Sequence, residues 1–250
     1  MTAVPTTQTP ASYEILGETV RLPVEIRAAR ADFAAFWVPV GPVATLLDGT
    51  GLVAAQAAPR RAVVMLVAVK YLDGDLGPYN EAGVAIMVRP HDSAPVSTAR
   101  NVAGFWRGEA RAYIRDLCVN QAFTLEAGRK IWGFPKQMAA IGIEHRRSST
   151  VCTLAEGGHD VWHLEIGRGL GGFSAKGAEM QSYSRLGGVL RMVPWVTDNE
   201  GVRFRPGGAR LSLGDHRLAD TLGSLGLPRT AAFCGSIENF RATWGAAAVV

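Results

Sequence analysis

The stretch AVVMLVAVKY at residues 62–71 is an apolar run rich in β-branched residues, and the turn-forming pair Asp73-Gly74 follows it. A second run of the same kind, AGVAIMVR at residues 82–89, stops at Pro90. Apolar runs bounded by turn residues are typical of buried strands. We therefore predict two strands, close together in the chain and separated by a turn.

Strand patterns continue through the rest of the chain. We expect further strands at residues 112–119, 137–145, 150–155, 160–166, 189–195, 202–205, 209–213 and 231–240, with a turn at Gly157-Gly158. Because strands follow strands with few helices between them, a parallel βαβ array is disfavoured. The predicted fold class is α+β, with a mainly antiparallel, curved or closed sheet.

Helical patterns are few. The clearest lies at residues 123–132 and ends at Gly133 and Pro135, and a short helix is expected at residues 218–225. At residues 30–47 the apolar spacing is helical, but two prolines interrupt it, so we expect two short helices with a break.

Composition indicates a globular chain with one domain. The chain has 250 residues, 48% of them hydrophobic and 19% charged, which supports a sizeable core and excludes extended disorder. A Thr- and Pro-rich stretch suggests a flexible arm at residues 1–12, followed by a single domain at residues 13–250. Its three cysteines, Cys118, Cys152 and Cys234, stand far apart in apolar runs, so we expect buried free thiols.

The charge pattern limits the partners. The net charge is +4, but the basic residues are scattered, whereas a nucleic-acid binder usually concentrates them on one face. The longest apolar run, residues 62–69, is too short to cross a bilayer, and the first residues lack a signal-peptide pattern. We therefore expect a cytoplasmic protein that binds neither nucleic acid nor membranes.

Two familiar motifs are present without their context. The glycines of GRGLGG at residues 167–172 match a dinucleotide fingerprint, but no βαβ unit surrounds them, so a loop between strands is expected. His159 and His163 lie on a predicted strand, where a spacing of four residues separates them by about 13 Å, too far to share one ion. We expect no metal and no cofactor.

One lysine, Lys136, has an unusual sequence context. Only four of the 26 basic residues are lysines, and Lys136 directly follows Pro135 in the segment GRKIWGFPKQ, residues 128–137. Trp132 and Phe134 precede it, so its amine is expected to emerge from an apolar wall. Loss of hydration in such a place lowers the pKa of a lysine and favours the nucleophilic amine. The alternative is an ordinary surface lysine after a helix-stopping proline.

The segment GRKIWGFPK resembles the signature of the acetoacetate decarboxylase family. The stretch YNEAGVAI at residues 79–86 is similar to that family's Tyr-x-Glu-x-Gly segment, and residues 190–194 (LRMVP) and 209–213 (ARLSL) resemble its C-terminal strands. The resemblance implies a cone-like antiparallel β-barrel with flanking helices, usually in a homo-oligomer. It also implies that Lys136 forms a Schiff base with a keto acid and that Glu81 lies in the active site.

The resemblance extends to the substrate-binding residues, with some departures. It implies substrate contacts from Tyr79, Trp132, Phe134 and Gln137, and an active-site arginine at Arg21 or, as second choice, Arg27. Gln137 stands where the family has a second lysine, so desolvation must supply most of the activation of Lys136. The stretch that matches the family's second buried glutamate, residues 64–67, is apolar, with Leu66 near that place.

Three functions are compatible with these residues. The first is a lyase that decarboxylates acetoacetate or a related β-keto acid through a lysine iminium. The second is an aldolase-dehydratase that joins pyruvate to an aldehyde through the same Schiff base, an alternative that the missing second lysine and glutamate favour. The third is a non-catalytic barrel that binds a small apolar or anionic ligand. Glu81 could serve as acid, base or positioning group in either enzyme.

Overall fold

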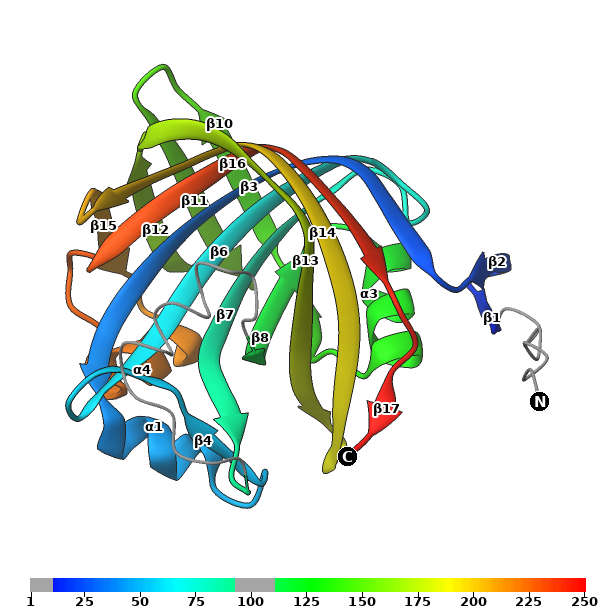
Figure 1. The fold of residues 1–250 in the computed structure, drawn as a ribbon, viewed down its shortest axis with the longest axis horizontal. Helices are drawn as coiled ribbons and strands as arrows, with labels where there is room; N and C mark the ends of the chain where they lie inside the picture. The colour runs from blue at the N-terminus through cyan, green and yellow to red at the C-terminus, as the bar shows by residue number, and fades with distance from the viewer. Residues whose placement is uncertain (1–10, 93–110) are drawn as a thin grey trace, which may run out of the picture.

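The computed structural model describes residues 11–92 and 111–250, and its centre is a closed seven-stranded β-barrel (Figure 1). The strands that form the wall are, in spatial order, β3 (Val24–Pro39), β6 (Arg61–Gly74), β7 (Tyr79–Pro90), β8 (Arg111–Val119), β13 (Leu170–Leu186), β14 (Val189–Pro206) and β16 (Phe233–Trp244). Pairing of β16 with β3 closes the circle. All neighbours in the wall are antiparallel except β8 and β13, which run parallel.

A four-stranded antiparallel sheet lies against one side of the barrel. It consists of β10 (Ala140–His145), β11 (Ser149–Glu156), β12 (His159–Gly167) and β15 (Ala209–Leu213). Buried side chains from β3, β6 and β7 pack against β11 and β12 in the largest core cluster. Two further clusters fill the inside of the barrel.

The remaining elements are short. Within the described residues the helices are α1 (Val40–Leu47), α3 (Ala122–Ala127), the π-helical turn η1 (Gly128–Trp132) and α4 (Arg217–Ser224). The small strands described are β1 (Ser12–Ile15), β2 (Glu18–Arg21), β4 (Leu52–Ala54), β5 (Gln56–Ala58), β9 (Lys136–Met138) and β17 (Ala248–Val249). Strands β1 and β2 form a hairpin that projects from the barrel next to α3 (Figure 1). Across the described residues, no helix combines the length and apolar character needed to cross a membrane.

The predicted fold class is confirmed, with local corrections. The first helix expected in residues 30–47 is wrong, because that segment continues strand β3 as far as Pro39, and only α1 is helical. The strands expected at residues 189–195 and 202–205 are one long strand, β14. The loop expected between strands at residues 167–172 is shorter than predicted, because β12 ends at Gly167 and β13 begins at Leu170. The predicted arm lies outside the described residues up to residue 10, and Ser12 already belongs to β1.

The three cysteines are free and buried, as predicted. Burial raises the pKa of the Cys118 thiol to about 12 and those of Cys152 and Cys234 to about 11. Because the thiolate is the reactive form, we expect none of the three to react with a thiol reagent at pH 8 in the folded protein. Labelling with and without denaturant would test this, and rapid labelling of the native protein would contradict it.

Candidate active site

Lys136 is held by the helical segment that precedes it. The side chain of Gln121 caps α3 by accepting a hydrogen bond from the Thr124 backbone N–H at 2.8 Å. The chain then continues as η1 and leaves it at Gly133, whose φ of 69° is a left-handed conformation that favours glycine. The Arg129 guanidinium reaches forward and donates to the Lys136 carbonyl at 2.8 Å. Helix and strand are thus tied together at the residue that begins β9.

The amine of Lys136 lies inside the barrel. The residue is only 3% exposed, and its Nζ is 2.9 Å from Glu81 Oε2 and 2.8 Å from Thr124 Oγ1. Nζ also lies over the ring of Tyr79, 5.2 Å from the centroid, within the range of a cation–π contact. The buried amine therefore faces one carboxylate, one hydroxyl and one aromatic face.

Glu81 receives a second contact from Tyr71. The Tyr71 hydroxyl donates to Glu81 Oε1 at 3.0 Å, and the rings of Tyr71 and Tyr79 stack with centroids 4.2 Å apart. Burial, and in second place the negative charge of Glu81, raises the pKa of both tyrosines well above the ordinary value. The Tyr71 hydroxyl therefore remains a donor to the carboxylate throughout the neutral range.

This contact predicts a measurable loss on Tyr71→Phe. The substitution leaves Glu81 Oε1 without its donor in a buried place, which should lower the free energy of unfolding by about 1–3 kcal/mol. Urea denaturation measures it. Tyr113→Phe is the matched control, since no hydrogen bond of that hydroxyl is found within the described part of the chain; an equal loss in both variants would refute the role assigned to Tyr71.

The raised tyrosine pKa values also predict how the free energy of unfolding changes at alkaline pH. In the unfolded chain a tyrosine loses its proton near pH 10, whereas Tyr71 and Tyr79 keep theirs in the folded protein. The folded state then binds more protons, so the stability contributed by these two tyrosines is complete below about pH 10 and is lost as pH rises beyond it. Unfolding free energies measured from pH 8 to 11 should show this decline, and Tyr71→Phe should reduce its slope; a flat profile would contradict the assignment.

The amine and carboxylate open into an apolar cavity of about 220 Å³. Five aromatic residues of one core cluster line this cavity: Trp132, Phe134, Trp195, Phe240 and Trp244. Trp195 and Trp244 stack at 4.4 Å, and Phe134 meets Trp244 edge to face at 5.8 Å. A cavity that is mainly apolar, with a few polar groups at one place, is the usual form of a small-molecule site.

The structure brings together five of the predicted site residues. Lys136, Glu81, Tyr79, Trp132 and Phe134 all line the cavity. Sequence reasoning missed Tyr71 and Thr124, which contact this group. Tyr71 could have been found from the predicted strand pair, because it lies directly across from Tyr79 on the neighbouring strand. For Thr124 no signal in the sequence was available.

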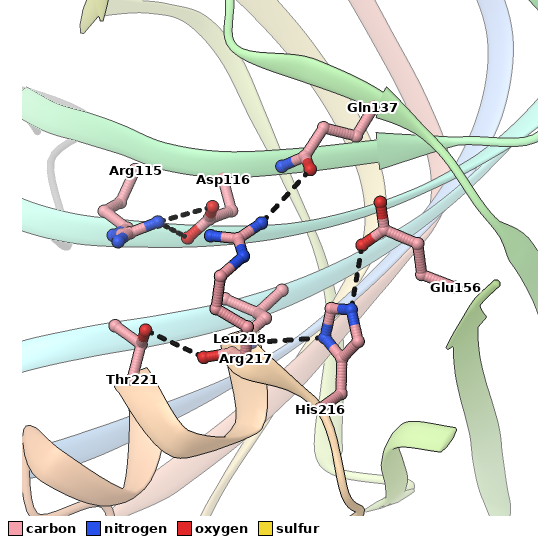
Figure 2. Close-up of polar contacts among 8 residues, drawn as sticks. All are labelled: Arg115, Asp116, Gln137, Glu156, His216, Arg217, Leu218 and Thr221. Atoms are coloured by element: carbon pink, nitrogen blue, oxygen red, sulfur yellow. Dashed lines mark hydrogen bonds and ion pairs between the residues drawn. The ribbon is translucent and has the colours of Figure 1, made fainter. Parts of the chain in front are cut away.

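The other predicted contacts lie elsewhere. Arg21 is exposed on β2 and does not line the cavity, and Arg27 is exposed and paired with Asp73 and Asp75. Gln137 follows Lys136 on a strand, so its side chain lies on the opposite face, where Arg217 donates to it at 3.5 Å (Figure 2). None of these three is part of the cavity wall.

Behind the Lys136 strand, polar contacts hold α4 in place (Figure 2). His216 caps α4 by accepting a hydrogen bond from the Leu218 backbone N–H at 3.1 Å, and its other ring nitrogen lies 3.1 Å from Glu156 of β11. Asp116 is buried beside Arg115 at 2.5 Å, and burial raises the pKa of its carboxyl. This network supports the outer face of β8 and β9.

Comparisons with known proteins identify the family and the fold. The model of the acetoacetate decarboxylase family matches residues 9–250. The chain belongs to this family. Among solved structures it resembles the acetoacetate decarboxylase of Legionella pneumophila, with a TM-score of 0.68 and 16% identity over 91% of this chain and 87% of the other. No curated protein matches the sequence.

Two further solved structures share the fold. One is the enduracididine biosynthesis enzyme MppR in complex with pyruvate, with a TM-score of 0.59 and 15% identity over 97% of this chain and 98% of the other. Another is an acetoacetate decarboxylase-like enzyme from Sphingomonas wittichii RW1, with a TM-score of 0.56 and 13% identity over 92% and 94%. At these identities the likeness shows a shared barrel fold.

Proposed function

We propose that this protein is a Schiff-base enzyme in which Lys136 condenses with the carbonyl of a β-keto acid and releases CO2 from it. The observation that carries the proposal is a primary amine that is 3% exposed and opens into an apolar cavity, 2.9 Å from a carboxylate. Membership of the acetoacetate decarboxylase family supports the same chemistry.

The first step needs a free amine. Glu81 takes a proton from the Lys136 ammonium, and the nitrogen lone pair then attacks the keto carbon of the substrate. The carbonyl oxygen leaves as water, with Glu81 returning the proton, and a cationic iminium remains. Tyr71 and Thr124 keep the carboxyl and the amine oriented through their hydrogen bonds.

The iminium then draws electrons from the bond to the carboxylate. That C–C bond breaks, CO2 leaves, and the electron pair forms the neutral enamine. The enamine carbon takes up a proton, and water hydrolyses the resulting iminium to release the ketone and the lysine.

The walls of the cavity favour this step. Among the described residues that line it, Lys136 is the single cationic side chain. A substrate carboxylate would therefore be poorly solvated and would lie close to Glu81. Because decarboxylation converts the iminium and carboxylate charges into a neutral enamine and CO2, an apolar site favours the transition state over the ground state.

A second candidate is condensation of pyruvate with an aldehyde. Solved structures of MppR contain pyruvate and the condensation product of pyruvate and imidazole 4-carboxaldehyde, and MppR shares this barrel. In this chain a pyruvate enamine on Lys136 would attack the aldehyde carbon, and Glu81 would supply the proton for loss of water.

Borohydride trapping followed by a paired assay tests the proposal. Reduction in the presence of acetoacetate or pyruvate should add ligand mass to the peptide that contains Lys136. CO2 release from acetoacetate is then compared with condensation of pyruvate and an aromatic aldehyde. CO2 release without condensation supports the decarboxylase, condensation alone supports the second candidate, and the absence of any adduct leaves a non-catalytic binding barrel.

A further inference from the structure

The cavity extends along the barrel, well away from the reactive amine. On β7 the residues that face the inside alternate with those that face the outer core, so Glu81, Ala85 and Met87 share the inner face. At about 3.3 Å per residue, Ala85 and Met87 lie roughly 13 and 20 Å further along the strand than Glu81. All three line the same cavity. Its far end is therefore beyond the reach of a substrate as short as acetoacetate that is bound to Lys136.

The far end is apolar and rich in methionine. We call it the methionine end, and its lining residues are Phe33, Met65, Ala85, Met87 and Met180. Together with neighbouring apolar residues they form a cluster separate from the one around Lys136. Methionine side chains are flexible and polarizable, so such a wall adapts to an apolar guest.

The other polar groups in the lining already have partners within the protein. Asp32 accepts from Thr150 Oγ1 at 3.0 Å and lies 3.2 Å from His145 Nε2, on the side of the second sheet. Ser182 Oγ accepts from the indole of Trp195 at 2.9 Å. Within the described lining, the methionine end itself contains no charged side chain. A ligand group placed there finds apolar contacts and no cation for a second carboxylate.

The volume indicates the shape of that group. The cavity volume of about 220 Å³ is spread over the whole length between Lys136 and the methionine end. The cavity is therefore a narrow channel. A narrow apolar channel fits an unbranched chain better than a branched or bulky group. Each methylene buried in it should tighten binding about fourfold.

We infer that the substrate is a 3-oxo acid with an unbranched alkyl tail of medium length, whose tail occupies the methionine end. This inference rests on the proposed function, because it places the keto group at Lys136. The chemistry is unchanged: the C–C bond to the carboxylate breaks, CO2 leaves, and the product is a methyl ketone with the same tail.

Borohydride trapping with two 3-oxo acids tests the inference on the whole protein. Adduct on the Lys136 peptide is measured against the concentration of acetoacetate and of 3-oxododecanoate, whose nine-carbon tail is long enough to reach Ala85. We expect half-maximal labelling at a concentration at least roughly tenfold lower for the longer acid, as eight additional methylenes allow. Equal or weaker labelling by the longer acid would overturn the chain-length inference and leave the proposed function standing. Labelling by neither acid would overturn the proposed function itself.

Variants locate the tail. Ala85→Phe fills the methionine end from β7, and Met180→Phe narrows it from β13, so both should reduce the preference for 3-oxododecanoate over acetoacetate at least fivefold, about the value of one or two methylenes. Val196→Leu is the matched control, because Val196 is exposed and directly follows the cavity residue Trp195. An unchanged preference in a folded Ala85→Phe or Met180→Phe protein would overturn the assignment of the tail to this end.

Discussion

Lys136→Met is expected to abolish both borohydride labelling and turnover. Methionine has nearly the length of lysine but no amine, so no iminium can form. Removing a nucleophile that acts with its partner groups as a unit costs on the order of 10³-fold or more in kcat. Lys136→Arg is the charge-preserving companion, since a guanidinium keeps the positive charge next to Glu81 but does not lose its proton to become a nucleophile. CO2 release and peptide mass spectrometry measure the two losses.

Stability separates the chemical role of Lys136 from its structural one. Lys136→Met leaves the Glu81 carboxylate buried beside an apolar side chain, and breaking a buried ion pair in this way costs about 3–5 kcal/mol. Adding Glu81→Gln removes the unpaired charge, so the double variant should recover much of that loss without any turnover. Urea denaturation of the two single variants and the double variant gives the coupling.

Two results would contradict the roles assigned to Lys136. Turnover that survives in a folded Lys136→Arg protein would reject the Schiff base. A double variant as unstable as Lys136→Met would show that Glu81 is not compensated by the lysine in the native protein.

Much of the fold was predictable because its strands carry a strong local signal. The runs at residues 62–71 and 82–89 form the adjacent strands β6 and β7. Strand β3 was misread because both of its faces are buried over residues 33–36: Phe36 and Ala34 pack against the second sheet, while Phe33 and Ala35 face the inside of the barrel. Without an exposed face, alternation disappears, and the spacing of Phe33, Phe36 and Trp37 resembles a helix.

The candidate site was predictable where a sequence motif indicated its residues. Tyr79, Trp132 and Phe134 lie within four residues of Glu81 or Lys136 in the chain. Because η1, β7 and β9 are continuous local elements, these aromatic residues stay close to the two charged ones in the structure. Gln137 does not line the cavity, because adjacent residues on a strand lie on opposite faces and Lys136 takes the inner one. Arg21 does not line the cavity either, because it lies on the hairpin that projects from the barrel. No local sequence pattern shows where such a hairpin docks.

Gly128→Ala is the second change with a large expected effect, because this glycine makes room for the amine. A Cβ at position 128 would lie 2.5 Å from Cδ and 2.6 Å from Cε of Lys136. The backbone there is helical, with φ −60° and ψ −41°, so alanine fits the conformation and only the space is missing. The lysine stem must move and loosen its contacts with Glu81 and Thr124. A displacement near 1 Å at reacting groups costs on the order of 100-fold in rate.

Gly223→Ala is the matched control for this effect. Gly223 lies in α4, and a Cβ there would meet no atom within 4 Å. Replacing glycine by alanine inside a helix stabilises it by about 0.5–1 kcal/mol, so this variant should unfold at higher urea and label Lys136 normally. At position 128 the same helical gain is opposed by the displaced ion pair. Labelling of Gly128→Ala as fast as that of Gly223→Ala would show that the amine does not depend on the space left by Gly128.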